Sequence, residues 1–232
     1  MNWCDLPLVG FDTETTGVEA KQSRLVTAAI IVREDGRDSA RTWLADPGVE
    51  IPAAAAAVHG VTTEYARTHG ADATQVLEEV AELLTEHLVA GHPVVAFNAK
   101  YDLELMEAEL ARHGLPTLTE RVGQILPIVD PLVLDRALDR WRKGKRTLSI
   151  VAENYGVQVD GQAHNADVDV LLALGVAQAI ARKFPQVGQL SAVDVHAFQV
   201  QAFTAWAQDF ISFRRRSLPS FDTSTVWPAD LD

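Results

Sequence analysis

Apolar residues in the first part of the chain occur in short runs that predict strands. A first buried strand covers residues 8–11 and is ended by the turn residue Gly17. Two further strands are predicted at residues 24–34 and 37–46, because an Asp-Gly pair, typical of a hairpin turn, separates them. These three elements predict an antiparallel start to a sheet.

Beyond residue 50, helical spacing of apolar positions alternates with short apolar runs. Helices are predicted at residues 53–62, 72–90, 98–113 and 147–156, with a long helix after Asn165. Strands are predicted at residues 93–97 and at the start of 125–134. Antiparallel strands followed by strand–helix alternation indicate an α/β fold with a mixed central sheet flanked by helices.

The segment Phe184–Gln189 interrupts the pattern, and apolar residues at helical spacing resume after it. We therefore expect a main domain at residues 1–184 and a helical extension at residues 185–232. About 50 residues make a poor core alone, so the extension is predicted to dock on the main domain.

Composition fits this picture. The chain has 232 residues, of which 47% are hydrophobic and 22% are charged, as in one compact domain with an appendage. Its single cysteine, Cys4, excludes an internal disulfide and favours a reducing cytoplasm. No apolar run reaches membrane-spanning length and the N-terminus lacks signal-peptide features, so a cytoplasmic location without membrane partners is expected.

The net charge is −12, which disfavours tight nonspecific binding to nucleic acid duplexes. Basic residues are nevertheless clustered, five of the 20 Lys and Arg at residues 140–146 and three more at residues 214–216. Each cluster is compatible with a solvated loop or helix end, or with phosphate binding. The first is the favoured guide for a phosphate backbone, through Arg142, Lys143 and Lys145.

The first strand ends in a pair of carboxylates, Asp12 and Glu14. Residues two apart on a strand point to the same face, so the two side chains lie side by side. Two like charges this close cost free energy unless something positive lies between them.

Two other segments carry candidate partners for this pair. Asn98 and Asp102 are four apart, which places them on one face of the predicted helix. His164 precedes Asp169 by five residues at the start of the long helix, where Asn165 is a natural N-cap. Asp167 competes with Asp169, since helical phase alone does not choose between them.

The segments FDTETTG, NAKYD and HNADVD, together with the intervening VHGVT, resemble the exonuclease motifs of the DEDD superfamily. The resemblance is to its histidine-containing branch, which includes the proofreading epsilon subunit of bacterial DNA polymerase III, ribonuclease T and oligoribonuclease. The tyrosine branch does not fit, because Asn165 holds the position of its tyrosine. The resemblance spans about residues 8–184 and implies a ribonuclease H-like fold.

The resemblance also implies roles for individual residues. Two divalent cations, Mg²⁺ or Mn²⁺, would be bound by Asp12, Glu14, Asp102 and Asp169, with His164 as the general base. The terminal nucleotide would be lined by Thr13, Thr15, Thr16, His59 and Asn98.

Chemistry supports this assignment. Two cations stabilise the charge that develops when a phosphodiester is hydrolysed, carboxylate oxygens are their preferred ligands, and histidine takes up a proton near neutral pH. We therefore expect a metal-dependent 3′–5′ exonuclease that releases 5′-mononucleotides from single-stranded or frayed DNA. The alternatives are an exoribonuclease acting on RNA or oligoribonucleotides, or a polymerase-associated proofreading or binding subunit with a replication or repair partner.

Overall fold

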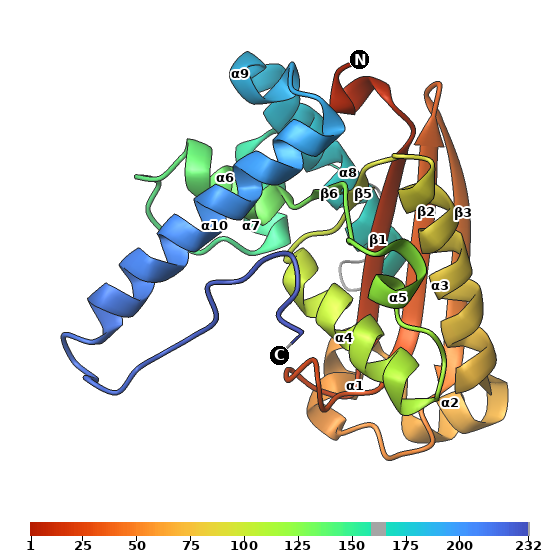
Figure 1. Ribbon diagram of the computed structural model, residues 1–232. Helices are drawn as coiled ribbons and strands as arrows, with labels where there is room; N and C mark the ends of the chain where they lie inside the picture. The colour runs from red at the N-terminus through yellow and green to blue at the C-terminus, as the bar shows by residue number, and fades with distance from the viewer. Residues whose placement is uncertain (159–165, 232) are drawn as a thin grey trace.

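The computed structural model describes residues 1–158 and 166–231, and its strands form one six-stranded sheet in the order β4-β3-β2-β1-β5-β6 (Figure 1). The strands are β1 (Leu8–Thr15), β2 (Leu25–Glu34), β3 (Arg37–Asp46), β4 (Ala71–Asp72), β5 (Val94–Val95) and β6 (Ile128–Val129). β2 runs antiparallel to both β1 and β3, whereas β5 is parallel to β1 and to β6. The predicted mixed sheet flanked by helices is confirmed.

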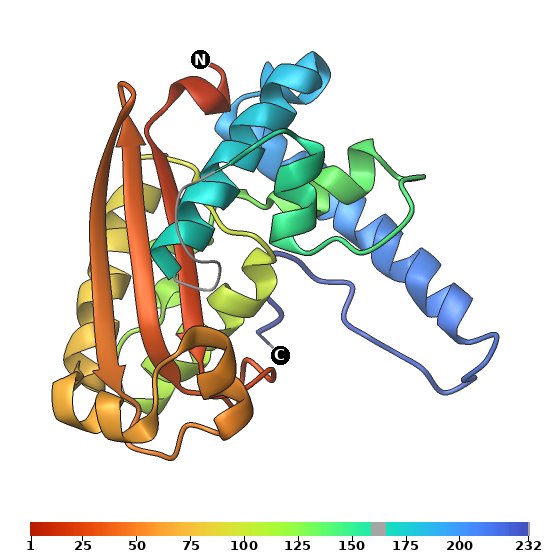
Figure 2. The ribbon, with the colours of Figure 1, turned by 180° about the vertical axis from the view of Figure 1, so that it is seen from behind.

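Helices cover both faces of this sheet. They are η1 (Trp3–Asp5), α1 (Ala53–His59), α2 (Thr63–His69), α3 (Ala73–Val89), α4 (Ala99–Arg112), α5 (Leu118–Val122), α6 (Pro131–Leu138), α7 (Leu148–Asn154), α8 (Ala166–Lys183), α9 (Pro185–Gly188) and α10 (Ala192–Arg214). The views from front and back place α3, α4 and α5 on one face and α8 on the other (Figures 1 and 2). Within the described ranges, no helix is both long and apolar enough to cross a membrane.

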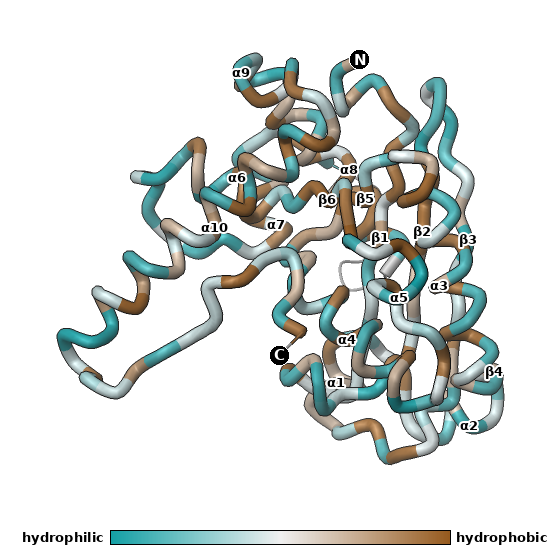
Figure 3. Tube along the Cα trace, viewed as in Figure 1, coloured by the Kyte–Doolittle hydropathy of each residue, from teal (hydrophilic) through white to brown (hydrophobic). Residues whose placement is uncertain are grey.

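The central strand β1 is buried on both faces. Val9 and Phe11 belong to the core beneath α3 and α4, whereas Leu8 belongs to the core beneath α8. Burial on both faces explains why this strand begins as a continuous apolar run. Hydrophobic residues accordingly gather around β5 and β6, while the tip of the β2–β3 hairpin is hydrophilic (Figure 3).

The C-terminal segment packs against the edge strand β6 through α10. Gln199 is fully buried on α10, and its side-chain amide accepts from the Asp130 N–H at 2.6 Å and donates to the Ile128 carbonyl at 2.9 Å. His196 Nδ1 accepts from the Ile128 N–H at 3.2 Å. Polar side chains thus satisfy backbone groups that an edge strand would leave unpaired.

After α10 the chain returns to the main domain (Figure 1). Lys100 Nζ on α4 donates to the Val226 carbonyl at 2.9 Å, and Trp227 is only 4% exposed. The extension therefore docks as expected, while a domain boundary at residue 184 stays a prediction.

Replacing Gln199 with Leu should lower the free energy of unfolding by about 1–3 kcal/mol, because the buried Asp130 N–H would lose its acceptor. Urea unfolding measures this loss. The matched control is Gln201→Leu, on the same helix but exposed, which should change stability little. Equal effects of the two substitutions would contradict the pairing of α10 with β6.

Candidate active site

Three carboxylates meet where β1 and α8 cross. Asp12 and Glu14 extend from the same face of β1, and Asp169 lies in the first turn of α8. Each offers an oxygen, and these oxygens all lie within 4.8 Å of one another. The structure thus brings together the predicted strand pair and Asp169.

A glycine on β1 allows α8 to lie this close to the strand. A Cβ added to Gly10 would lie 2.4 Å from Val170 Cγ1 and 2.9 Å from Leu174 Cδ1, both on α8. Contacts this short would force the helix away from the strand. Because Asp169 immediately precedes Val170, the small residue at position 10 fixes its distance to Asp12 and Glu14.

Asp102 lies on α4 beside β1 and raises the pKa of Asp12, but it is not among the three carboxylates whose oxygens lie within 4.8 Å of one another. It is 4% exposed in the first turn of α4, where its Oδ1 accepts from the Thr13 N–H at 3.1 Å and the Thr13 hydroxyl at 2.6 Å. These bonds tie the start of α4 to β1. They fix one oxygen of Asp102 beside the strand.

A buried carboxylate that the sequence patterns did not single out holds the start of α4. Asp130, which follows β6, accepts from the backbone N–H groups of Asn98 and Ala99, both at 3.0 Å. The side chain of Asn98 makes no capping bond, and this residue is left-handed at φ 69°. Asn98 thus occupies the N-cap position of α4, but its side chain does not cap the helix. A side chain from a neighbouring strand satisfies those groups instead.

Burial and mutual repulsion dominate the electrostatics of the cluster. Burial, then Asp102, Glu14 and Asp169, raise the pKa of Asp12 well above its ordinary value. Burial and Asp169 raise the pKa of Glu14 to about 7. Burial also raises the pKa of Asp102 to about 7, although the hydrogen bonds from Thr13 act in the opposite direction. In the described residues, no positive side chain lowers the pKa of Asp12 or Glu14.

A cavity of about 420 Å³ opens beside the carboxylates, with Glu14, His59 and Asp167 among its lining residues. His59 is 8% exposed, and its Nδ1 accepts from the Val61 N–H at 3.2 Å, so in the neutral ring the proton is on Nε2. That Nε2 has no hydrogen-bond partner among the described residues. Burial lowers the pKa of His59, while the Thr15 backbone acts in the opposite direction. His59 thus offers a donor beside the carboxylates.

The three threonines expected at the substrate use their hydroxyls within the protein. Thr13 bonds to Asp102, and Thr16 Oγ1 accepts from the Arg24 N–H at 2.9 Å. The Thr15 hydroxyl lies 2.6 Å from the hydroxyl of Tyr101, which also donates to the Gly17 carbonyl. Tyr101, which the helical pattern alone places in the core, therefore links α4 to the end of β1.

The structure distinguishes the two aspartates at the start of α8. Asp169 joins Asp12 and Glu14, whereas Asp167 is exposed at the cavity and its Oδ1 accepts from the Val168 N–H. His164, the expected general base, lies outside the described residues, as does Asn165.

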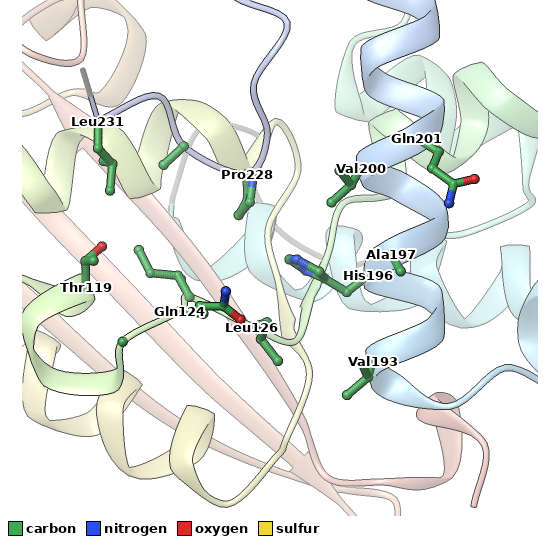
Figure 4. A pocket seen from close by; sticks show the side chains of 13 residues that line it. Thr119, Gln124, Leu126, Val193, His196, Ala197, Val200, Gln201, Pro228 and Leu231 are labelled. Atoms are coloured by element: carbon green, nitrogen blue, oxygen red, sulfur yellow. The ribbon is translucent and has the colours of Figure 1, made fainter.

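A second cavity, of about 540 Å³, lies between the segment after α5, α10 and the C-terminal tail (Figure 4). Its lining is mostly apolar, with Leu126, Val200 and Pro228 among the residues around His196. None of the clustered carboxylates lines it. Of these two cavities, only the smaller is lined by a member of the carboxylate cluster, Glu14.

The carboxylate cluster fits a divalent cation by its donor set. Asp12, Glu14 and Asp169 supply oxygens close enough to share one ion, and hard cations prefer such ligands. A bound cation would also offset the repulsion that raises the pKa values of Asp12 and Glu14. The coarse expectation of a divalent-metal site is thus supported by the residues themselves.

Comparison with known proteins agrees with this geometry. A family model described as "Exonuclease" (RNase_T) matches residues 9–177, which include the whole cluster. The PolC-type DNA polymerase III of Streptococcus thermophilus is 31% identical over 163 residues, covering 69% of this chain and 10% of the polymerase. The "Uncharacterized exonuclease CP81" of Escherichia phage 186 is 29% identical over 197 residues, covering 78% of this chain and 91% of the phage protein. The chain thus spans about a tenth of the length of the polymerase relatives.

Solved structures with the same fold include two exonucleases. E. coli exonuclease I in complex with a dA16 oligonucleotide has a TM-score of 0.66 at 17% identity, over 78% of this chain and 42% of that one. Exonuclease X in complex with 5′ overhanging duplex DNA has a TM-score of 0.57 at 21% identity, over 82% of this chain and 99% of that one. At this identity the likeness shows the fold.

The raised pKa values predict how the metal-free protein responds to pH. Glu14 and Asp102 hold protons more tightly when folded, so their contribution to stability is present below their ordinary pKa and is lost as pH rises through about 7. In EDTA, the melting temperature should therefore fall between pH 5 and pH 8, by roughly 2–4 °C for each kcal/mol lost. At pH 8, Asp12→Asn should have a higher melting temperature than the wild type. Its melting temperature should also fall less between pH 5 and pH 8.

Differential scanning calorimetry across this pH range measures the effect. Saturating Mn²⁺ at pH 8 should restore the melting temperature of the wild type, because bound ligand stabilises the folded state. It should raise the melting temperature of Asp12→Asn less. A melting temperature that responds to pH identically in both proteins would contradict repulsion within the cluster. The exposed Asp38→Asn substitution, away from the cluster, controls for a general change in charge.

Proposed function

The chain belongs to the DEDD family of exonucleases, and from that premise we propose that it removes nucleotides from the 3′ end of DNA, releasing 5′-mononucleotides. The observation that carries the proposal is the meeting of Asp12, Glu14 and Asp169 within the segment matched by the family. Mutually repelling carboxylates in a partly dry site are costly for folding alone. They are useful where cations and a phosphate are to be bound.

We propose that Asp12, Glu14, Asp102 and Asp169 hold two divalent cations, Mg²⁺ or Mn²⁺. When bound, such cations neutralise charge on the phosphoryl and leaving oxygens and lower the pKa of a coordinated water. Burial and neighbouring carboxylates raise the pKa values of Asp12, Glu14 and Asp102. That electrostatic environment favours cation binding over binding of a bare anion.

His164 is the proposed general base. Its imidazole takes a proton from water as the water oxygen bonds to phosphorus, and the bond from phosphorus to the 3′ oxygen of the preceding nucleotide breaks. The leaving oxygen takes up a proton, which leaves a shortened strand with a 3′ hydroxyl and a free 5′-mononucleotide. In the sequence, His164 lies two residues before the start of α8 and five before Asp169.

The remaining residues are proposed to receive the terminal nucleotide. His59 carries the donor that lacks a protein partner, so its Nε2–H is proposed to bind an oxygen of the nucleotide. Thr15, Thr16 and Asn98 are proposed to line the same end of the site. Thr13 already donates to Asp102, and we therefore propose that it positions this carboxylate through its hydroxyl.

DNA is the favoured substrate, because the similar proteins include DNA polymerases and exonucleases solved in complex with DNA. RNA is the second candidate, since the motifs recognise a phosphodiester and the sugar is selected by pocket shape. A polymerase-associated proofreading subunit is the other alternative, favoured by the PolC-type relatives, in which the matched segment is part of a longer chain.

Asp12→Asn and Asp169→Asn should abolish hydrolysis in Mg²⁺ or Mn²⁺, because each removes a ligand from the cluster. His164→Ala should keep metal-dependent stabilisation but lose roughly 10²–10⁴-fold in rate, the usual contribution of a general base. Shortening of a 5′-labelled oligonucleotide, with and without EDTA, measures both effects. Asp167→Asn, outside the cluster, is the matched control at the start of α8.

Near-normal turnover by either aspartate variant would contradict the two-metal proposal. Circular dichroism and melting curves should show that both variants are folded, so that loss of activity reports the chemistry. Loss of hydrolysis with an intact response of the melting temperature to Mn²⁺ would separate a defect in proton transfer from a defect in metal binding.

Matched DNA and RNA oligonucleotides of one sequence distinguish the two substrate classes. We expect a higher kcat/KM on single-stranded DNA than on RNA, and a higher one on single strands than on blunt duplexes. A preference for RNA would replace the favoured substrate with the alternative while leaving the chemistry unchanged.

A further inference from the structure

An exposed tryptophan stands in the connection between α6 and α7, residues 139–147, which we call the Trp141 loop. Trp141 is 85% exposed, whereas the other four tryptophans of the chain are buried or partly buried. A large aromatic ring in solvent is unfavourable unless a partner covers it. The Trp141 loop is also the densest basic segment of an otherwise acidic chain, with five Lys and Arg residues.

Buried contacts hold this loop in one conformation. Asp135 is completely buried on α6, and its Oδ2 pairs with Arg142 Nη2 at 2.6 Å and also with Arg146. The Tyr155 hydroxyl donates to Asp135 Oδ1 at 3.2 Å, and Arg146 Nη2 donates to the Asp139 carbonyl at 2.7 Å. Two arginines of the loop are therefore anchors and not exposed cations.

This arrangement changes which residues of the basic cluster face solvent. Arg142 and Arg146 have side chains only 13% and 14% exposed, so the expected phosphate role of Arg142 is not supported. Lys143 and Lys145 are exposed and have no ion pair in the described part of the chain. Arg140 pairs with Asp209 at 2.8 Å, and its guanidinium carbon lies 5.3 Å from the centre of the Trp141 ring. The anchored loop thus displays an indole beside two free ammonium groups.

The loop lies on the side of the molecule that carries the start of α8. Seen from behind, α7 and the connection leading into it lie in front of α10, on the same side as α8 (Figure 2). α7 packs directly against α8, whose first turns carry Asp169. A strand whose 3′ end enters the carboxylate cluster can therefore continue toward the Trp141 loop over this face.

We propose that the Trp141 loop is a second contact site for single-stranded nucleic acid, remote from the scissile phosphate. A base stacks on Trp141, and Lys143 and Lys145 pair with neighbouring phosphates. Aromatic stacking combined with cations is how proteins bind single strands without reading their sequence. The proposal rests on the proposed exonuclease function for its substrate. It adds a reason for longer strands to bind more tightly than dinucleotides.

The second basic cluster provides a contrast within the same chain. Arg215 pairs with Asp222 at 3.4 Å and donates to the Phe221 carbonyl at 2.8 Å. Arg214 and Arg216 lie over the rings of Phe221 and Phe213, with Phe213 62% exposed. These arginines contact the tail of their own chain. Phe213 is thus an exposed aromatic near cations that is suited to serve as a control.

Binding is tested with fluorescence anisotropy on the full chain, in an Asp12→Asn background with Mg²⁺ to prevent degradation. The probes are 5′-labelled dT16 and dT4. Trp141→Ala should weaken dT16 binding roughly 5- to 100-fold, from the usual energy of one stacked base, and change dT4 binding little. Trp141→Phe should restore most of the affinity. Lys143→Ala combined with Lys145→Ala should lower the slope of log affinity against log salt by about 1.4.

Phe213→Ala is the matched control and should leave dT16 binding unchanged. Equal losses on dT4 and dT16, or no loss from Trp141→Ala, would overturn the proposal. Melting curves show whether each variant is folded. Arg142→Met should lower the melting temperature by removing one of the two arginines that pair with Asp135, which separates anchoring from binding.

Failure of this proposal is distinguishable from failure of the proposed function. Hydrolysis of a dinucleotide by the protein with an intact Asp12 tests the chemistry, and it does not involve the Trp141 loop. Dinucleotide hydrolysis that is unaffected by Trp141→Ala, together with lost dT16 binding, is the expected result. Length-dependent binding through Trp141 without hydrolysis of either substrate would reject the exonuclease function and leave a single-strand binding site.

Discussion

The close packing of α8 on β1 holds like charges together, and the candidate site depends on it. At Gly10 there is no room for even one methyl group between the strand and the side chains of Val170 and Leu174. This contact places Asp169 against Asp12 and Glu14 and removes water from around them. Apolar burial on both faces of β1 supplies the favourable free energy that offsets the resulting repulsion.

Other buried carboxylates of the molecule show how unusual this cluster is. Asp130 accepts three backbone N–H groups, Asp135 pairs with two arginines, and Glu109 accepts from the Leu25 N–H and pairs with Arg112. These partners stabilise the ionised forms. Burial and neighbouring carboxylates raise the pKa values of Asp12 and Glu14, and, unlike at Asp130, no hydrogen bond or positive side chain of the described residues acts against that rise. A binding site for cations is the natural consequence of that difference.

The same principle divides the basic residues. Arginines that pair with a buried carboxylate, such as Arg142 and Arg146, anchor the chain, and their charges are neutralised within the protein. Lysines on the same loop are left facing solvent beside Trp141. The exposed charge of the Trp141 loop is therefore positive, although the net charge of the chain is −12. A polyanion can thus be attracted to this part of an acidic molecule.

The sequence by itself determined five of the six strands, the strand pair Asp12 and Glu14, and the exonuclease family, because strand alternation and motif order are local properties of the chain, whereas the short edge strand β4 was not predicted. Helical phase left Asp167 and Asp169 open and the motif resemblance favoured Asp169, and the tertiary structure then brings Asp169 to that pair through the packing of α8 against Gly10. Only the tertiary structure decided that Asp130 holds the start of α4 and that Arg142 is buried. Asp130 contacts backbone groups that are distant from it in the sequence, and Arg142 is shielded from solvent because it pairs with the buried Asp135. No local sequence pattern encodes either contact.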